Sequence, residues 1–258
     1  MSASPTTEKL QKVLARAGLG SRRELETWIA EGRVRVNGRP ARLGARVSAR
    51  DVIHVDGKRL SRRALDQPRL RVLRYHKPEG EICSAVGDAR HASVVARLPR
   101  LKRGRWVAVG RLDVNSSGLL LFTNEGELAH RLMHPSREVE REYAVRLRGD
   151  VTREMRARLL DGVELADGPA RFERIEDAGG DGVNRWFHVV IREGRNREVR
   201  RLWESQGLQV SRLIRVRYGP VRLPRYLSRG RWEELGPRAG GVRASASGAA
   251  PAARRAPR

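Results

Sequence analysis

The pattern of apolar and polar positions in the first 60 residues predicts two short helices. A first apolar stripe at helical spacing stops before a pair of glycines and consists of Leu10, Val13, Leu14 and Ala17. A second helix is expected to begin at Ser21, because Glu24 three residues later completes a capping box, and to end at Gly32. The buried face of this second helix is predicted to comprise Leu25, Trp28 and Ile29.

Short strands are predicted to follow these helices. Residues 34–36 alternate apolar and polar side chains before an Asn-Gly dipeptide, and residues 52–55 lead into an Asp-Gly dipeptide. Both dipeptides favour tight hairpin turns. The pattern therefore predicts a small domain of helices and hairpins.

Composition and pattern together divide the chain into three regions. Residues 8–68 form the small domain and include a polar, proline-containing stretch that is typical of a linker. Residues 70–237 carry the strands, helical segments and glycine turns of a larger α+β domain. Residues 238–258 consist almost wholly of Ala, Gly, Ser, Pro and Arg, and we expect a disordered basic tail.

In the larger domain, one carboxylate is predicted to lie on a turn between two core strands. The strand predicted over residues 106–109 breaks at Gly110, and the apolar strand LLLFT follows the segment RLDVNSSG. Asp113 is therefore expected on a rigid scaffold yet at an edge, as a catalytic group should be. Arg111 and the general positive charge should favour its ionised form.

Two further segments suggest partners for this carboxylate. In the strand REYAVRLR, Tyr143 shares a face with Val145 and Leu147, which is also the ordinary place of a core tyrosine. Later, a strand meets a helix whose Val199, Leu202 and Trp203 are predicted to face inward. Four arginines gather where that helix begins, which calls for a carboxylate or a phosphate close by: Arg195, Arg197, Arg200 and Arg201.

The charge of the chain indicates a polyanionic partner. The formal net charge is +24, from 54 Lys and Arg against 30 Asp and Glu. Nucleic acid is the first candidate, since no segment combines a basic face with a strongly apolar one, as a membrane-surface helix would. No apolar run is long enough to span a bilayer and the N-terminus lacks a secretory pattern, so a cytoplasmic location without a membrane partner is expected.

The small domain offers a candidate phosphate site. Arg22 and Arg23 lie in the first turn of the second helix, where the helix dipole disfavours cations. A phosphate bound by the helix amides and both guanidinium groups would reverse that penalty, and Arg33 and Arg35 lie nearby in the sequence. The alternative is that these are solvated arginines without a ligand.

Metal chemistry has little support in the sequence. The single cysteine, Cys83, allows neither an internal disulfide nor a zinc framework. His130 and His134 are spaced i, i+4 on a predicted helix, but no glutamate of the zinc-protease type lies between them. No metal site is therefore predicted.

The two domains predicted above each resemble a known family. The run EKLQKVLARAGLGSRRELETWIAEGRVRVNG is similar to the small RNA-binding domain named after small-subunit ribosomal protein four. The segments GRLDVNSSGLLLFTNEGELAHRLMHPS and EGRNREVRRLWESQGLQVSRLIRVRYGP resemble one family of ribosomal pseudouridine synthases, which comprises synthase A of the small ribosomal subunit together with synthases B, E and F of the large one. With YHKPEGEICS at 75–84, the resemblance covers almost everything before the tail.

The resemblance implies a fold and a set of site residues. The fold would be α+β, with the small RNA-binding domain followed by a catalytic domain built on a mostly antiparallel mixed sheet flanked by helices. Asp113 would be the catalytic aspartate, and Arg111 would help to displace the target base. Tyr143 would stack on the flipped uracil, and Arg200 would form a salt bridge with Asp113. Arg195 and Arg197 are expected to contact RNA beside Arg22, Arg23, Arg33 and Arg35.

The implied activity is the isomerisation of uridine to pseudouridine in ribosomal RNA. The implied substrate is 23S ribosomal RNA near the peptidyl-transferase region, or an intermediate in the assembly of the large subunit. This reaction needs no cofactor, and a monomer is expected. A glycosidase would need a second, protonated carboxylate, and only one carboxylate here lies in a distinctive catalytic context. The remaining alternative is a non-catalytic RNA-binding assembly factor, which would have little use for a carboxylate facing a polyanion.

Overall fold

The computed structural model describes residues 7–61, 68–84, 86–180 and 184–236. These residues divide into two compact units, one formed by residues up to 70 with 99–106, and the other by 71–98 and the residues from 107 onward. The expected tail at 238–258 and most of the expected linker lie outside the described residues. The segment 99–106 joins the first unit although it lies far along the chain, which the sequence pattern did not predict.

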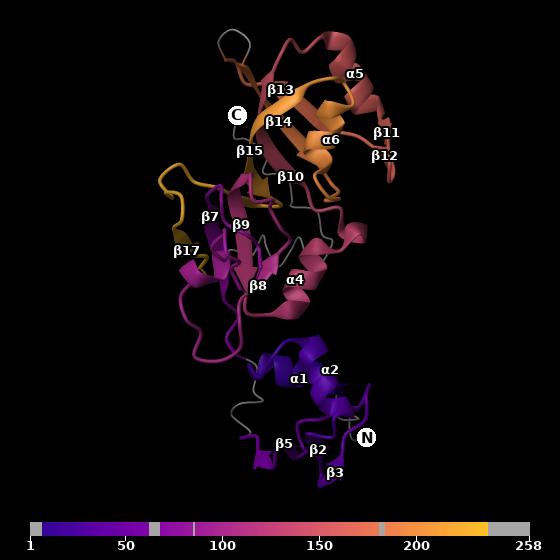
Figure 1. The fold of residues 1–258 in the computed structure, drawn as a ribbon, viewed down its shortest axis with the longest axis vertical. Helices are drawn as coiled ribbons and strands as arrows, with labels where there is room; N and C mark the ends of the chain where they lie inside the picture. The colour runs from indigo at the N-terminus through magenta and orange to yellow at the C-terminus, as the bar shows by residue number, and fades with distance from the viewer. Residues whose placement is uncertain (1–6, 62–67, 85, 181–183, 237–258) are drawn as a thin grey trace, which may run out of the picture. The chain divides into compact units, whose positions relative to one another are not determined.

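The first unit contains the predicted helices and hairpins (Figure 1). Its helices are α1 (Leu10–Arg16) and α2 (Arg22–Ala30). A four-stranded sheet has the order β3 (Arg39–Pro40), β2 (Val34–Val36), β5 (Ile53–Val55), β6 (Lys58–Arg59), and β1 (Glu8–Lys9) pairs with β4 (Arg46–Val47). Most of the two predicted apolar stripes forms its core, but Trp28 is only partly buried, and Ala17 lies just beyond the end of α1, partly buried and outside the core cluster.

Local interactions in this unit explain why the sequence pattern succeeds. The Ser21 hydroxyl accepts the Glu24 amide at 3.1 Å, and the Glu24 carboxylate accepts the Ser21 amide at 3.2 Å, so the predicted capping box is confirmed. Asn37 and Asp56 adopt positive φ in the two hairpin turns, a conformation that Asn and Asp tolerate better than most residues. Short-range rules therefore determine most of this unit.

The second unit is built on a nine-stranded sheet (Figure 1). Its main order is β13 (Arg174–Asp177), β14 (Asn184–Ile191), β10 (Arg141–Arg148), β15 (Gln209–Tyr218), β9 (Ser117–Thr123), β7 (Val72–Lys77), β17 (Trp232–Glu234), with β16 (Val221–Arg222) beside β15 and β8 (Val107–Val109) beside β9. Every pairing is antiparallel except that of β15 with β9. A separate hairpin joins β11 (Val163–Leu165) and β12 (Gly168–Ala170).

Helices flank this sheet, as expected. They are α4 (Gly126–Met133), α5 (Arg153–Asp161) and α6 (Glu198–Glu204), with short 3-10 turns at Val94–Arg97 and Pro135–Arg137. Trp203 of α6 packs against Phe172 and Phe187, with ring centroids 5.5 and 5.7 Å away, so α6 covers the inward face of β14. The predicted α+β fold with a mostly antiparallel mixed sheet is confirmed.

The parallel pairing of β9 with β15 depends on Gly118. This residue has φ +107°, and a Cβ atom added there would lie 2.3 Å from the Arg215 carbonyl oxygen. A side chain cannot occupy that space, because the obstacle is backbone. Gly118 therefore lets two strands approach closely just beyond the turn that carries Asp113.

We expect Gly118→Ala to lower the free energy of unfolding by more than about 2 kcal/mol, through the clash and the positive φ together. Gly230→Ala is the matched control, since Gly230 also has positive φ but an added Cβ meets no described atom within 4 Å. Its expected cost is about 1 kcal/mol. Urea unfolding of both variants measures the difference, and equal losses would contradict this role of Gly118.

Candidate active site

A cavity of about 470 Å³ opens beside the turn that carries Asp113. Asp113 is partly exposed and lies in the loop between β8 and β9, so it reaches the cavity from the end of two core strands. The cavity walls also include Arg111, Tyr143, Arg195 and Arg197. Five of the residues singled out from the sequence thus meet around one hollow of a size typical for small-molecule sites.

The buried side chain of Lys77 holds the turn that carries Asp113. Its side chain is completely buried, and Nζ donates to the carbonyls of Asp113 at 3.0 Å, Ser116 at 2.8 Å and Pro78 at 3.0 Å. Burial lowers the pKa of the Lys77 ammonium. Three carbonyl oxygens stabilise the buried ammonium. Because two of them belong to Asp113 and Ser116, Lys77 also links two positions of the turn.

Other groups hold the remaining backbone of this loop. The Gly80 amide donates to the Val114 carbonyl at 2.7 Å. Two arginine side chains also donate to loop carbonyls: Arg200 to Asn115 at 3.0 Å and Arg215 to Arg111 at 3.3 Å. The loop is therefore held residue by residue, so the Asp113 carboxylate is presented from a preorganised backbone.

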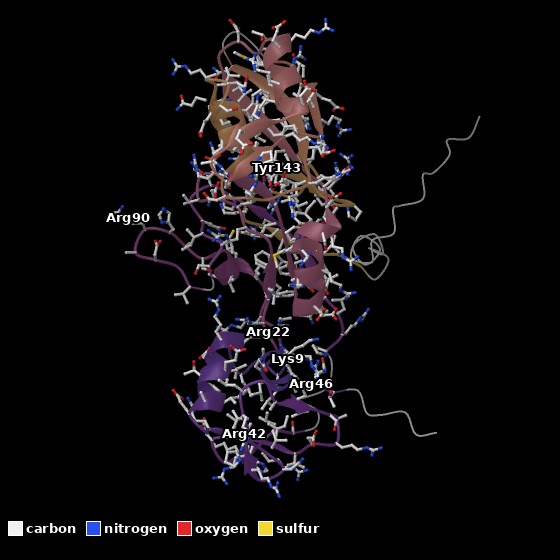
Figure 2. The ribbon with its side chains drawn as sticks, turned by 90° about the vertical axis from the view of Figure 1, so that its right-hand side faces the viewer. Lys9, Arg22, Arg42, Arg46, Arg90 and Tyr143 are labelled. Atoms are coloured by element: carbon white, nitrogen blue, oxygen red, sulfur yellow. The ribbon has the colours of Figure 1, made fainter. Side chains whose placement is uncertain are left out.

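Tyr143 lies in the wall of the cavity and in the core at once. It belongs to β10, is 7% exposed, and points to the same side of the sheet as the fully buried Val145 and Leu147. Its ring forms part of the cavity lining (Figure 2 labels it). From the sequence, Tyr143 could be either a core residue or a residue of the site, and its position is compatible with both roles.

Arg200 differs from what the resemblance implied. It is 5% exposed in α6, and its guanidinium donates to the carbonyls of Val210 and Asn115. Within the described part of the chain it forms no ion pair with Asp113 at 4 Å or less, so the expected salt bridge is replaced here by carbonyl contacts. Burial lowers the pKa of Arg200, while the charge of Asp113 acts in the opposite direction. The two groups are close enough to interact electrostatically.

Two of the three cavity arginines that the sequence indicated are exposed. Arg111 is exposed next to Asp113. Arg197 is exposed at the start of α6 with positive φ, and its guanidinium lies 3.7 Å from Glu204, which is a long ion pair. Both cations can therefore turn toward a ligand.

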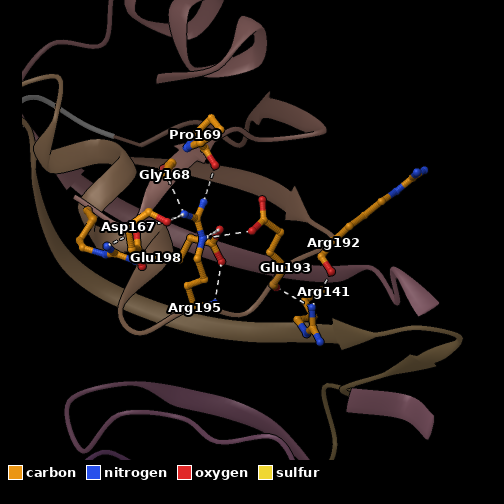
Figure 3. A network of polar contacts seen from close by, with 9 residues as sticks. Arg141, Asp167, Gly168, Pro169, Arg192, Glu193, Arg195 and Glu198 are labelled. Carbon is orange, nitrogen blue, oxygen red and sulfur yellow. Dashed lines mark hydrogen bonds and ion pairs between the residues drawn. The ribbon is translucent and has the colours of Figure 1, made fainter. Parts of the chain in front are cut away.

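Arg195 is bound within the protein instead (Figure 3). Its guanidinium donates to the carbonyls of Asp167, Gly168 and Pro169 in the β11–β12 hairpin, at 3.1, 3.1 and 2.7 Å. It also contacts the carboxylates of Asp167, Glu193 and Glu198. The expectation that Arg195 contacts RNA is not supported by these contacts, because its donors already have partners. The sequence predicted a carboxylate or a phosphate close to the arginines that precede α6. For Arg195 the partners are carboxylates and backbone carbonyls.

Glu198 is a buried carboxylate that the sequence analysis did not single out. It is 3% exposed, accepts the Arg195 amide at 3.0 Å, and lies in the cavity wall. Burial raises the pKa of Glu198, despite the nearby Arg195. Its contacts indicate that it orients Arg195 and the loop before α6.

Two buried arginines at the cavity were also missed. Arg141 and Arg215 are 8% and 2% exposed, and their Cζ atoms each lie 5.2 Å from the centroid of the Tyr218 ring. The sequence contains a signal for Arg215, because in the strand SRLIRVRY this residue shares its face with the apolar Leu213. An arginine at an inward position of a strand is unusual and indicates a polar cavity.

The four arginines of the first unit that were expected to contact RNA fall into two groups. Arg22 and Arg23 are exposed at the start of α2 (Figure 2 labels Arg22), and Arg35 is exposed in β2. Arg33 instead forms a bidentate pair with Asp56 at 2.8 and 2.7 Å and lies 4.2 Å from the centroid of the Trp28 ring. Arg33 thus contributes to the fold of the unit, and its expected contact with RNA stays a prediction.

The two histidines of α4 and its end lie close together, with ring centroids of His130 and His134 5.4 Å apart. The described residues contain no group of three His, Cys, Asp or Glu side chains placed to hold a metal ion. None of the described helices combines the length and apolar character that crossing a bilayer requires.

The family follows from comparison with known proteins. The sequence pattern of the family described as RNA pseudouridylate synthase matches residues 71–205, and that of the S4 domain matches residues 8–53. The chain belongs to the RNA pseudouridylate synthase family. The resemblance stated from the sequence is confirmed, as is its small RNA-binding domain.

Individual relatives are close in sequence. The chain is 61% identical to ribosomal large subunit pseudouridine synthase B of Pseudomonas aeruginosa over 232 residues, which are 90% of this chain and 60% of that protein. It is 58% identical to the protein of the same name from Escherichia coli K12, covering 89% and 79%. A crystal structure of a pseudouridylate synthase superimposes with a TM-score of 0.63 at 26% identity, covering 91% and 99%. The chain spans about three fifths of the length of the Pseudomonas relative.

Proposed function

We propose that this protein isomerises uridine to pseudouridine in ribosomal RNA and that Asp113 is its catalytic carboxylate. The observation that carries this proposal is the combination of a carboxylate on a backbone held by buried side chains with a cavity that an aromatic ring and several cations line. Membership of the pseudouridylate synthase family supports an enzyme and speaks against the non-catalytic assembly factor.

The reaction explains the composition of the cavity. The C1′–N1 bond of uridine breaks, the base rotates, and C5 bonds to C1′; the proton lost at C5 is balanced by one gained at N1. Atoms and electrons balance within the nucleotide, so no cofactor takes part in the proposed step. The base must first leave its stack, which costs a few kcal/mol and favours an aromatic surface that receives it. Tyr143 is that surface in this proposal, and Arg111 fills the gap left in the RNA.

Asp113 acts next to the sugar of the everted nucleotide. As a nucleophile it would attack C1′, and as a base it would remove the proton at C2′ while the uracil departs. Arg200 supports it through the Asn115 carbonyl and by its charge rather than by a direct ion pair. Both routes require the carboxylate to be fixed before the RNA arrives.

The substrate we propose is 23S ribosomal RNA near the peptidyl-transferase region, or an intermediate of the large subunit that contains it, modified in the cytoplasm by a monomer. The names of the relatives as large-subunit synthases support this choice. Mapping pseudouridines by carbodiimide-primed extension in a strain lacking the gene tests it. Loss of one 23S signal that the intact gene restores would support the proposal, whereas an unchanged 23S map would contradict it.

We further propose that the S4 domain anchors the RNA through Arg22 and Arg23. The Arg22→Ala, Arg23→Ala double variant is expected to weaken RNA binding about tenfold and to reduce the slope of log affinity against log salt, because two phosphate contacts are lost. Arg33→Ala is the comparison, because Arg33 is engaged with Asp56. Filter binding at several salt concentrations measures both. An unchanged slope in the double variant would count against this docking role.

A further inference from the structure

Arg215 is a buried cation in the cavity wall to which the proposed function assigns no role. It lies in β15, is 2% exposed, and lines the same cavity as Asp113. Two nitrogens fix its guanidinium: Nε donates to the Leu119 carbonyl at 2.7 Å and Nη1 to the Arg111 carbonyl at 3.3 Å. Since the guanidinium is planar, these two bonds also determine where Nη2 points.

Nη2 of Arg215 is a donor without an acceptor. It is buried and has no hydrogen-bond partner among the described residues, and no carboxylate in that part of the chain forms an ion pair with this guanidinium. A buried charged donor left unsatisfied is costly, and such groups are rare in folded proteins unless a ligand, an ion or water completes them. Arg215 lines the cavity, so a ligand bound there would approach its guanidinium from that side.

The neighbours of Arg215 show which part of a ligand it would meet. Tyr143 is its direct cross-strand partner in the β10–β15 pairing, so both side chains extend to the same side of the sheet. If a uracil stacks on Tyr143, the adjacent strand position lies at the edge of the base. The edge of uracil carries the exocyclic oxygens O2 and O4, which are hydrogen-bond acceptors.

We infer that Arg215 is a further catalytic residue, whose Nη2 donates to an exocyclic oxygen of the everted uracil and stabilises the charge that develops there; this inference rests on the proposed function. When the C1′–N1 bond breaks, its electron pair leaves with N1, and the negative charge spreads to O2 and O4. C5 later returns an electron pair to C1′ and loses its proton, while N1 gains one. A fixed cation at an oxygen acts most strongly while the base is detached.

A backbone phosphate is the less suitable acceptor for Nη2. Only 2% of Arg215 is exposed, whereas Arg111 and Arg197 are exposed cations at the same cavity. A phosphate that remains in the RNA backbone meets the exposed cations first. In this proposal the planar base enters the cavity and brings an exocyclic oxygen to the buried Arg215.

The test compares two substrates in single-turnover reactions of the full chain. One RNA carries uridine at the target position and the other carries 5-fluorouridine, whose fluorine withdraws electrons and makes the base a better leaving group. Arg215→Gln should slow conversion of the uridine RNA on the order of 100-fold, and loss of the 5-fluorouridine nucleoside from RNA digests by clearly less. RNA affinity should stay within about twofold. Arg215→Lys should show the same pattern with smaller losses, and it carries the test if the Gln variant does not fold.

Arg212→Gln is the matched control, since Arg212 is exposed on the same strand, and it should change neither rate. Equal slowing of both substrates by the Arg215 variants would indicate a structural role and overturn the inference, as would an unchanged rate with uridine. Failure of the unaltered protein to convert uridine at all would instead overturn the proposed function, so the two failures are distinguishable.

Discussion

Replacing Asp113 by Asn is expected to reduce pseudouridine formation by a factor on the order of 10⁴ or more, because the amide can neither attack C1′ nor accept a proton there. The side chain keeps its size, and the loop around it is held through backbone carbonyls that the substitution leaves in place. Folding should therefore be unaffected. Carbodiimide-primed extension on a 23S fragment under single-turnover conditions measures the loss.

RNA binding by Asp113→Asn separates a catalytic role from a binding role. Removing a negative charge that faces a polyanion should leave affinity unchanged or slightly increased. Asp150→Asn is a suitable control, since Asp150 is an exposed aspartate of the same unit outside the cavity lining. Wild-type rates in Asp113→Asn would refute Asp113 as the catalytic group.

The second large effect is expected at Lys77. Lys77→Met removes the donor shared by the carbonyls of Asp113, Ser116 and Pro78 and leaves them without that partner in a buried site. We expect a loss of about 3–5 kcal/mol in the free energy of unfolding, because three carbonyls lose their donor and each unsatisfied buried acceptor costs about 1–3 kcal/mol. In protein that remains folded, the turn loses its fixed geometry, and activity should fall at least tenfold at unchanged RNA affinity.

Lys58→Met serves as the comparison for this prediction, because Lys58 is an exposed lysine in β6. Its unfolding free energy should change by no more than about 0.5 kcal/mol. Urea unfolding and the single-turnover assay are measured on both variants. If Lys77→Met were as stable and as active as Lys58→Met, the account of how the Asp113 turn is held would be wrong.

Elements governed by short-range rules were predictable from the sequence. The capping box at Ser21, the two hairpin turns of the first unit and the strands on either side of Asp113 all depend on residues a few positions apart. The S4-type domain and the synthase fold followed from motif resemblance. The grouping of residues 99–106 with the first unit was not predictable, because no local pattern marks it.

The site around Asp113 was predictable only in part, because the partners of its arginines lie far away in the chain. Arg195 meets a hairpin 26 to 28 residues earlier, and Arg200 meets the Asn115 carbonyl 85 residues earlier. A sequence shows that cations gather before α6, but not whether phosphate or protein satisfies them. Lys77 was missed for the same reason, since its three acceptors are backbone carbonyls, which carry no mark in the sequence.

Whether the protein isomerises uridine can be measured by following the hydrogen at C5 of the target base. Purified full chain is incubated with a 23S fragment that carries tritium at C5 of its uridines, and tritium release is compared with pseudouridine in the nuclease digest. We expect release of one tritium per pseudouridine formed, up to one per RNA molecule, because C5 exchanges its hydrogen for the bond to C1′. RNA that binds normally yet releases no tritium would contradict it.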